Sequence, residues 1–238
     1  METQKIYKYL SQKHADMMMK EGIIRIGTLY EYRKNEQPDK QRNDNNEGKM
    51  SYVYDIDVEI NARDLPKIFA DLVQEDVNFK NIILKTPLDA QNSYIYCGSQ
   101  VFDKNLMTEF KTECCVEIFD IKNFVETIGK QLANEGYIYN CVLQGPCNYI
   151  GHEVDVNFNE TAEFLKDKEL YGHQAEYRVI YKPLIYNDHG EIVKAEIESL
   201  GNGITEFRTP KREDACAPVI YPIIISCNEI IKFCRKIS

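Results

Sequence analysis

A glycine break at Gly172 is followed by a run in which large side chains alternate. The odd positions of residues 177–181 are Tyr, Val and Tyr and point one way, whereas Arg178 and Ile180 point the other, as in a half-buried strand. Glu176 stands at the start of this strand, and Gln174, two residues earlier, shares its side in an extended chain. A rigid sheet can hold a carboxylate there while it faces a cleft. The run therefore predicts a strand with a candidate chemical group at its mouth.

Apolar periodicity predicts strands and helices along most of the chain. Ser11 is a predicted N-cap for a helix over 12–21, and Gly22 is its predicted end. A chain of 238 residues can bury one large core, and nothing in it forces a division. We therefore expect one α+β domain over residues 1–238. The other expected strands cover 6–10, 23–29, 50–60, 82–85, 93–99, 115–119, 137–143 and 219–226, and the other expected helices cover 66–72, 104–110, 121–132, 160–170 and a terminal segment after 227–229.

Residues 33–49 lack any apolar period and are rich in turn formers. We expect a long mobile loop, and loops longer than about 12 residues in compact domains are often binding lids, although plain disorder fits nearly as well. The charged residues that would matter if this loop closed over a ligand are Arg33, Glu36, Asp44 and Glu47.

Composition indicates a globular protein in a reducing cytoplasm. Hydrophobic residues make up 43% of the chain, and no apolar run approaches the roughly 20 residues of a membrane helix. No amino-terminal targeting pattern is visible. The eight cysteines lack a disulfide framework or close zinc-type pairs, so we expect free buried thiols and no metal. A net charge of -9 disfavours long-range attraction to nucleic-acid phosphates, although a local basic site stays possible.

The polar candidates each have a structural alternative. Glu176 and Arg178 also read as solvated strand charges, and Ser99, at a small-residue corner, also reads as turn chemistry. His152 and Glu153 lack an HExxH partner, which favours a surface pair over a metal or acid–base site. Local sequence alone leaves these readings open.

Three separated patches along the chain together match one pattern. The first is Tyr7-Lys8-Tyr9-Leu10, a helix, and then Gly22-Ile23-Ile24-Arg25-Ile26. The second is Tyr96-Cys97-Gly98-Ser99 with Asn105-Leu106-Met107 and the run 115–120, and the third is Gln174-Ala175-Glu176-Tyr177-Arg178. In this order the patches resemble the ADP-ribosyltransferase superfamily, which includes poly(ADP-ribose) polymerases and diphtheria-like toxins. The last two patches also look like a large bacterial family of unknown function thought to share that fold. The resemblance covers most of residues 6–181 and implies a split, mainly antiparallel β core flanked by helices.

The resemblance also implies NAD as substrate. Glu176 would stabilise the oxocarbenium-like transition state at C1′, and Gln174 would orient the acceptor. Residues for NAD binding would be Lys8, Tyr9, Tyr94, Tyr96 and Ser99, with a tyrosine against nicotinamide. Lys8 stands where the superfamily commonly has histidine, and it has no planar donor fork. We expect it to lie beside the same cleft as Glu176.

The implied function is a cytoplasmic transferase, a toxin or phage-defence effector, that passes ADP-ribose to a protein or nucleic acid and is restrained by a possible antitoxin. Two alternatives stay open: a non-catalytic module that binds a nucleotide or a partner on the same fold, and an NAD glycohydrolase that uses water as the acceptor. No membrane partner is expected.

Overall fold

The computed structural model describes residues 4–33, 44–70, 73, 77–135, 137, 139–183, 186–187, 196–199, 205–208, 215–216 and 220–237. Helices accompany a mainly antiparallel, many-stranded sheet, so the predicted α+β class is confirmed. The strands are β1 (Ile6–Leu10), β2 (Ile23–Thr28), β3 (Lys49–Ile56), β4 (Ile60–Asn61), β5 (Asn78–Phe79), β6 (Ile82–Asp89), β7 (Tyr94–Ser99), β8 (Cys114–Ile118), β9 (Tyr139–Pro146), β10 (Glu153–Asp155), β11 (Glu176–Pro183), β12 (Tyr186–Asn187), β13 (Glu196–Ser199), β14 (Thr205–Arg208), β15 (Ala215–Cys216), β16 (Ile223–Ser226) and β17 (Cys234–Lys236). The α-helices are α1 (Gln12–Glu21), α2 (Leu29–Arg33), α3 (Lys67–Ala70), α4 (Lys104–Glu109), α5 (Ile121–Asn134) and α6 (Lys168–Tyr171), and shorter 3₁₀ helices cover Ala62–Asp64, Ala162–Phe164, Gly172–Gln174 and Asn228–Phe233.

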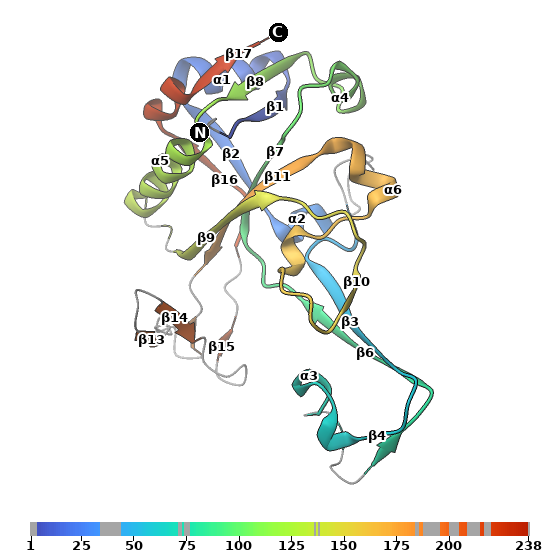
Figure 1. Cartoon of the computed structure of the whole chain (residues 1–238). Coiled ribbons are helices and arrows are strands. Elements are labelled where there is room, and N and C mark those ends of the chain that lie inside the picture. The colour runs from blue at the N-terminus through green and yellow to red at the C-terminus, as the bar shows by residue number, and fades with distance from the viewer. Residues whose placement is uncertain are drawn as a thin grey trace.

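Strand β7 is the axis of the central sheet (Figure 1). One edge of β7 pairs with β11 over its whole length, and β11 pairs in turn with β9. The other edge pairs with β2 at Tyr94 and Ile95 and with β1 at Ser99. Because β1 and β2 divide this edge between them, the sheet splits, and every pairing within it is antiparallel.

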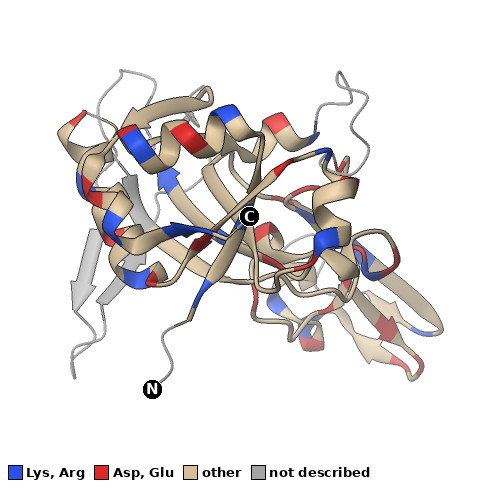
Figure 2. Ribbon diagram, turned by 90° about the horizontal axis from the view of Figure 1, so that it is seen from above, with Lys and Arg blue, Asp and Glu red and all other residues tan. Residues whose placement is uncertain are grey.

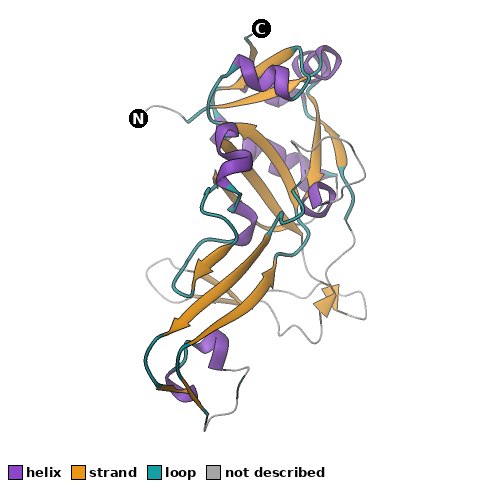
Figure 3. Cartoon of the chain, turned by 90° about the vertical axis from the view of Figure 1, so that its right-hand side faces the viewer, coloured by secondary structure: helices purple, strands orange, loops and turns teal. Residues whose placement is uncertain are grey.

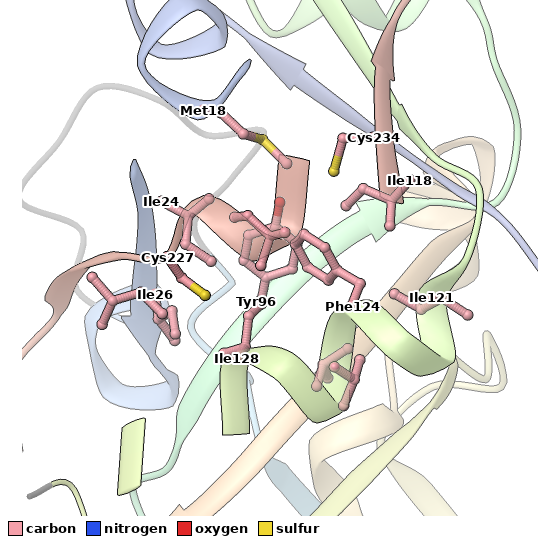
Figure 4. Close-up of a cluster of buried hydrophobic side chains, with 14 of the residues drawn as sticks. Met18, Ile24, Ile26, Tyr96, Ile118, Ile121, Phe124, Ile128, Cys227 and Cys234 are labelled. Atoms are coloured by element: carbon pink, nitrogen blue, oxygen red, sulfur yellow. The ribbon is translucent and has the colours of Figure 1, made fainter. Parts of the chain in front are cut away.

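Helices α1 and α5 cover one face of the central sheet and form the largest core. Phe124 and Ile128 of α5 lie against Tyr96 of β7 (Figure 4), and the Tyr96 and Phe124 ring centroids are 5.5 Å apart. Burying each such aromatic or aliphatic side chain contributes about 1.5–3 kcal/mol. Met18 of α1 completes the cluster from the other end, so the methionine-rich segment is core.

A second sheet projects from the first as a long arm (Figure 3). It contains β10, β3 and β6 in that order, with β10 parallel and β6 antiparallel to β3. The small elements β4, β5 and α3 lie at its far end (Figure 1). Acidic and basic residues are interspersed along the ribbon (Figure 2), in keeping with the modest net charge.

Locally encoded elements are confirmed. The Ser11 hydroxyl accepts from the His14 amide at the start of α1, and Gly22 ends that helix with φ of 62°, a left-handed conformation that favours glycine. Asp103 and Asp120 cap α4 and α5 as side-chain acceptors. Gly136 is expected to end the predicted helix over 121–132, and the turn formers Asn187-Asp188-His189-Gly190 predict a hairpin. Gly136 and most of residues 187–190 lie outside the described residues.

Two expected helices are wrong. The predicted helix over 160–170 is interrupted because residues 164–166 pair with Asn148: its amide donates to the Phe164 carbonyl at 2.7 Å, and the Lys166 amide donates to its carbonyl at 3.0 Å. The predicted terminal helix is a 3₁₀ helix, and the chain then enters β17, which pairs with β8. In both places tertiary hydrogen bonding overrides helical periodicity.

Candidate active site

The start of β11 positions Glu176. Glu176 lies directly opposite Ser99 of β7, and Arg178 lies opposite Cys97, so these four side chains share one face of the sheet. Immediately before the strand, Ala175 adopts φ of 43° and ψ of 50°, a left-handed conformation that turns the chain into β11. The Glu176 amide donates to the Tyr149 hydroxyl at 2.6 Å. Glu176 is 8% exposed, which makes it a buried carboxylate rather than a solvated strand charge.

Two cations hold the two oxygens of Glu176. Arg178 Nε donates to Oε1 at 2.7 Å, and Lys166 Nζ lies 2.9 Å from Oε2. Arg178 is 1% exposed and Lys166 is 3% exposed, so neither charge is hydrated. A buried cation is tolerated only when it is paired and hydrogen-bonded.

Glu47 supplies the second anion. Arg178 forms a two-pronged pair with its carboxylate, Nη2 to Oε2 being 2.9 Å, and Lys166 Nζ lies 3.7 Å from the same oxygen. The Glu163 carbonyl also accepts from Arg178, while the Glu163 carboxylate is paired with Lys182 at 2.7 Å. We call Glu47, Lys166, Glu176 and Arg178 the buried ion cluster; it contains two anions and two cations.

The cluster keeps Glu176 ionised. Burial by itself pushes the pKa of Glu176 upward, but the charges of Arg178 and Lys166 and their hydrogen bonds outweigh it, and the pKa lies well below its ordinary value. The two anions likewise outweigh burial at Lys166 and raise its pKa. Burial and the nearby Glu176 charge raise the pKa of the Cys97 thiol, so this cysteine stays protonated.

Of the residues expected to bind NAD or to act on it, Ser99 and Tyr9 lie on the Glu176 side of the sheet. Gln174 lies in the 3₁₀ helix before β11, and because Ala175 is left-handed, the expected extended relation between Gln174 and Glu176 is wrong. The Ser99 hydroxyl donates to the Gln174 carbonyl at 2.8 Å and thereby fixes the turn before β11. Tyr9 donates to the Val101 carbonyl at 3.0 Å and packs in a small cluster with Tyr7. Tyr7 is directly opposite Ser99, which places this part of β1 in the same row as Glu176.

Lys8, Tyr94 and Tyr96 lie on the opposite face. Because Tyr7 shares a face with Ser99, Lys8 alternates to the other one, where its ammonium lies 4.6 Å from the centroid of the Tyr96 ring. Its Nζ also donates to the Cys97 carbonyl at 2.5 Å. The expectation that Lys8 lies beside the same cleft as Glu176 is therefore wrong. Tyr94 and Tyr96 belong to the main core, and both are buried.

The end of the predicted mobile loop is part of the core. Residues 34–43 lie outside the described residues, but Asp44 and Glu47 are 5% and 1% exposed. Arg33 is fixed as well: its Nε donates to the Glu47 carbonyl at 2.5 Å, and its guanidinium stacks on Tyr30 at 4.2 Å. For residues 44–49 the expectation of a mobile loop is wrong because the Glu47 side chain pairs with buried Arg178.

Sequence reasoning missed Lys166, Tyr149 and the pairing of Glu47 with Arg178. Lys166 falls within the predicted helix over 160–170, which is interrupted in the structure, so the helical pattern gave no sign that its side chain is buried. The apolar pair Phe164-Leu165 next to Lys166 was the one indication in the sequence that this lysine is buried. A buried lysine is tolerated only when an anion is paired with it. Glu47 carried no such signal, because its neighbours are all polar or glycine.

Other expectations concern metal, membrane and thiols. No group of three or more His, Cys, Asp or Glu side chains in the described ranges is arranged to hold a metal ion. No helix within those ranges has the length and apolarity to span a bilayer. The described cysteines are free, as predicted; they are Cys97, Cys114, Cys115, Cys147, Cys227 and Cys234.

His152 and Glu153 do not act together. His152 Nδ1 lies 2.8 Å from the Lys49 carbonyl, whereas Glu153 pairs with Lys85 at 2.6 Å. Both line a hollow of about 480 Å³ on the arm sheet, which is a different sheet from the one that carries Glu176.

Comparison of the chain with protein-family models, with curated proteins and with solved structures finds no match.

Proposed function

We propose that the protein has the split-sheet fold of the ADP-ribosyltransferase superfamily and transfers ADP-ribose from NAD at the Glu176 end of β11. The observation that carries the proposal is that Glu176 is held as an anion at the mouth of a strand. Two cations fix its carboxylate, and burial strengthens the field that it exerts. Such a carboxylate suits a reaction in which positive charge develops at C1′ of the nicotinamide ribose.

The neighbouring groups have distinct parts in this proposal. Glu176 stabilises the cation formed as the bond to nicotinamide breaks, and the acceptor nucleophile then attacks C1′. Gln174 orients that acceptor, while Ser99 holds the turn through the Gln174 carbonyl. NAD would lie along the Tyr9 and Ser99 side of the sheet, since Lys8, Tyr94 and Tyr96 face the main core. Of the NAD-binding residues expected from the sequence, this proposal keeps Tyr9 and Ser99.

The biological setting of the proposal is a toxin or phage-defence effector acting in the cytoplasm. Its acceptor would be a protein or a nucleic acid, and the acidic composition favours protein. An antitoxin would be needed if the activity were constitutive. Growth arrest on induced expression of the native chain, relieved by Glu176→Gln, is the expected cellular result.

A second candidate is a non-catalytic module that binds a nucleotide or a partner. Two observations favour it: both Glu176 oxygens are already engaged by cations, and Lys8, Tyr94 and Tyr96 are turned away from Glu176. An NAD glycohydrolase shares Glu176 and differs only in using water. The products therefore separate the three candidates: a transferase gives an ADP-ribosylated acceptor, a glycohydrolase gives free ADP-ribose, and a binding module leaves NAD intact.

The decisive assay is nicotinamide release from labelled NAD, with and without cell extract as a source of acceptor. We expect release by the native chain and, for Glu176→Gln, turnover lower by roughly a hundredfold, on the scale of removing one well-placed electrostatic group. Both proteins are assayed below their melting transitions. Glu163→Gln is the matched control, since Glu163 is also a buried carboxylate and is paired with Lys182. Equal release by the native chain and Glu176→Gln would overturn the catalytic role of Glu176. No release by the native chain with any acceptor would replace this proposal by the binding module.

A further inference from the structure

Glu47 reaches the candidate site from a segment far from β11 in sequence. It is 1% exposed, both of its oxygens contact Arg178, and one lies 3.7 Å from Lys166 Nζ. Among the described residues, Glu47 forms ion pairs with Arg178 and Lys166 and not with Glu176 itself. Every connection between the two carboxylates runs through the cations that they share.

The charge balance of the cluster depends on Glu47. With Glu47, two anions face two cations and the buried ion cluster is neutral. Without it, one carboxylate would stand between Arg178 and Lys166, and the site would carry one excess positive charge. In a water-excluded site such a charge acts strongly on a nearby developing cation, and here it would repel it.

The segment that carries Glu47 is itself fixed. The Asp44 amide donates to the Tyr32 carbonyl at 2.9 Å, and the Asp44 side chain accepts from the Asn46 amide at 2.8 Å. Gly48 has φ of 66°, and a Cβ there would lie 2.5 Å from a methyl group of Leu29. The backbone on both sides of Glu47 is thus held independently of the ion pairs, so its carboxylate is presented to the cluster by a rigid turn.

We propose that Glu47 is a positioning residue for Glu176: it draws Arg178 and Lys166 partly onto itself and cancels their excess charge, which leaves the Glu176 carboxylate able to stabilise a substrate cation. This inference rests on the proposed transfer reaction and gives Glu47 an indirect part in it. The role is electrostatic and geometric, since Glu47 reaches no reacting atom except through the two cations.

The test compares two variants that separate charge from shape. Glu47→Gln keeps the shape and removes the charge, whereas Glu47→Asp keeps the charge and shortens the side chain. Glu163→Gln is again the control, because it removes a buried anion that is paired with Lys182 instead. For each folded protein we measure kcat and KM for nicotinamide release. We expect kcat to fall at least about tenfold in Glu47→Gln and less in Glu47→Asp, with KM for NAD nearly unchanged.

A second measurement does not require turnover. The ¹³C carboxyl resonance of Glu176, assigned by its loss in Glu176→Gln, is compared at pH 7, where the folded-state carboxylate is ionised. In Glu47→Gln this resonance should shift, because Arg178 and Lys166 then contact Glu176 without a second anion, while Glu163→Gln should leave it in place. If the native chain releases no nicotinamide, the proposed function fails and this resonance still decides whether Glu47 controls the charge at Glu176.

Unchanged kcat together with an unmoved Glu176 resonance in Glu47→Gln would overturn the inference. If that variant does not fold, Glu47→Asp decides it. A lowered kcat with native KM then supports positioning, and native kcat overturns it. A fall in melting temperature alone, with native kcat and an unmoved resonance, assigns Glu47 a purely structural role and equally overturns the proposal.

Discussion

Substitution of Glu176 by Gln should destabilise the protein strongly, whatever its effect on catalysis. The side chain is only 10% exposed and is in contact with Arg178 at 2.7 Å and Lys166 at 2.9 Å. Removing its charge leaves two buried cations facing the single anion of Glu47. Breaking a buried ion pair by removing one partner costs about 3–5 kcal/mol, because the remaining charge is neither hydrated nor paired. The local sequence, read as a solvated strand charge, predicts almost no loss.

This magnitude is a large part of the stability of an ordinary domain, which is about 5–15 kcal/mol. For a chain of this size it corresponds to a fall in melting temperature of roughly 6–20 °C. The assay is urea unfolding at pH 7 together with a thermal melt, with unchanged m-value as the sign that both proteins unfold in the same way. Glu153→Gln is the matched control, since it removes an exposed ion pair at 2.6 Å and should cost about 1 kcal/mol or less.

The pH dependence gives a second reading of the same prediction. The folded-state pKa of Glu176 is lowered, so the stability that its charge provides is fully present above the unfolded pKa of about 4.3 and is lost as pH falls through the folded value. The difference between native chain and Glu176→Gln should therefore be constant above about pH 5 and shrink in acid. A loss below about 1 kcal/mol at pH 7, equal to that of the control, would refute the buried ion cluster.

Three further predictions concern other positions. Lys8→Ala should lower the melting temperature and leave NAD affinity unchanged, because Lys8 lies over the Tyr96 ring on the far face, and weaker NAD binding without a stability change would contradict this placement. Ala175→Gly should stabilise the protein by about 0.5 kcal/mol and so raise its urea midpoint. Glycine removes the strain of a left-handed φ of 43°, about 1–2 kcal/mol, but part of this gain is lost because glycine has more conformational freedom in the unfolded chain. A lower midpoint would show that the turn is unstrained. Burial alone would raise the pKa of Glu117, but hydrogen bonds from Arg235 and Lys5 lower it. As the pH drops below about 4.3, the native chain should therefore lose stability faster than Glu117→Gln, as measured by melting between pH 3 and pH 7. Parallel curves would show that the Glu117 ion pairs do not contribute to the acid response.

Helix ends and strand faces in this fold are encoded by local sequence. Ser11 and Gly22 delimit α1 because capping is decided by a side-chain oxygen within three residues and by a backbone conformation that glycine favours. The alternation of residues 177–181 likewise fixes which side chains of β11 share a face, since strand geometry has a period of two. The choice of Glu176 as a candidate came from the same pattern.

The grouping of the site around Glu176 was decided only by tertiary structure. Strand alternation predicts that Tyr7 and Lys8 point to opposite faces of the sheet, but it does not predict which of the two shares a face with Glu176. That is decided by strand pairing, because Tyr7 and Glu176 both lie opposite Ser99. Lys166 is buried because residues 164–166 pair with Asn148 instead of forming a helix. Glu47 joins Arg178 across 131 positions of chain. Such contacts depend on strand register and on the need of buried charges for partners, and neither is encoded within the few residues around each group.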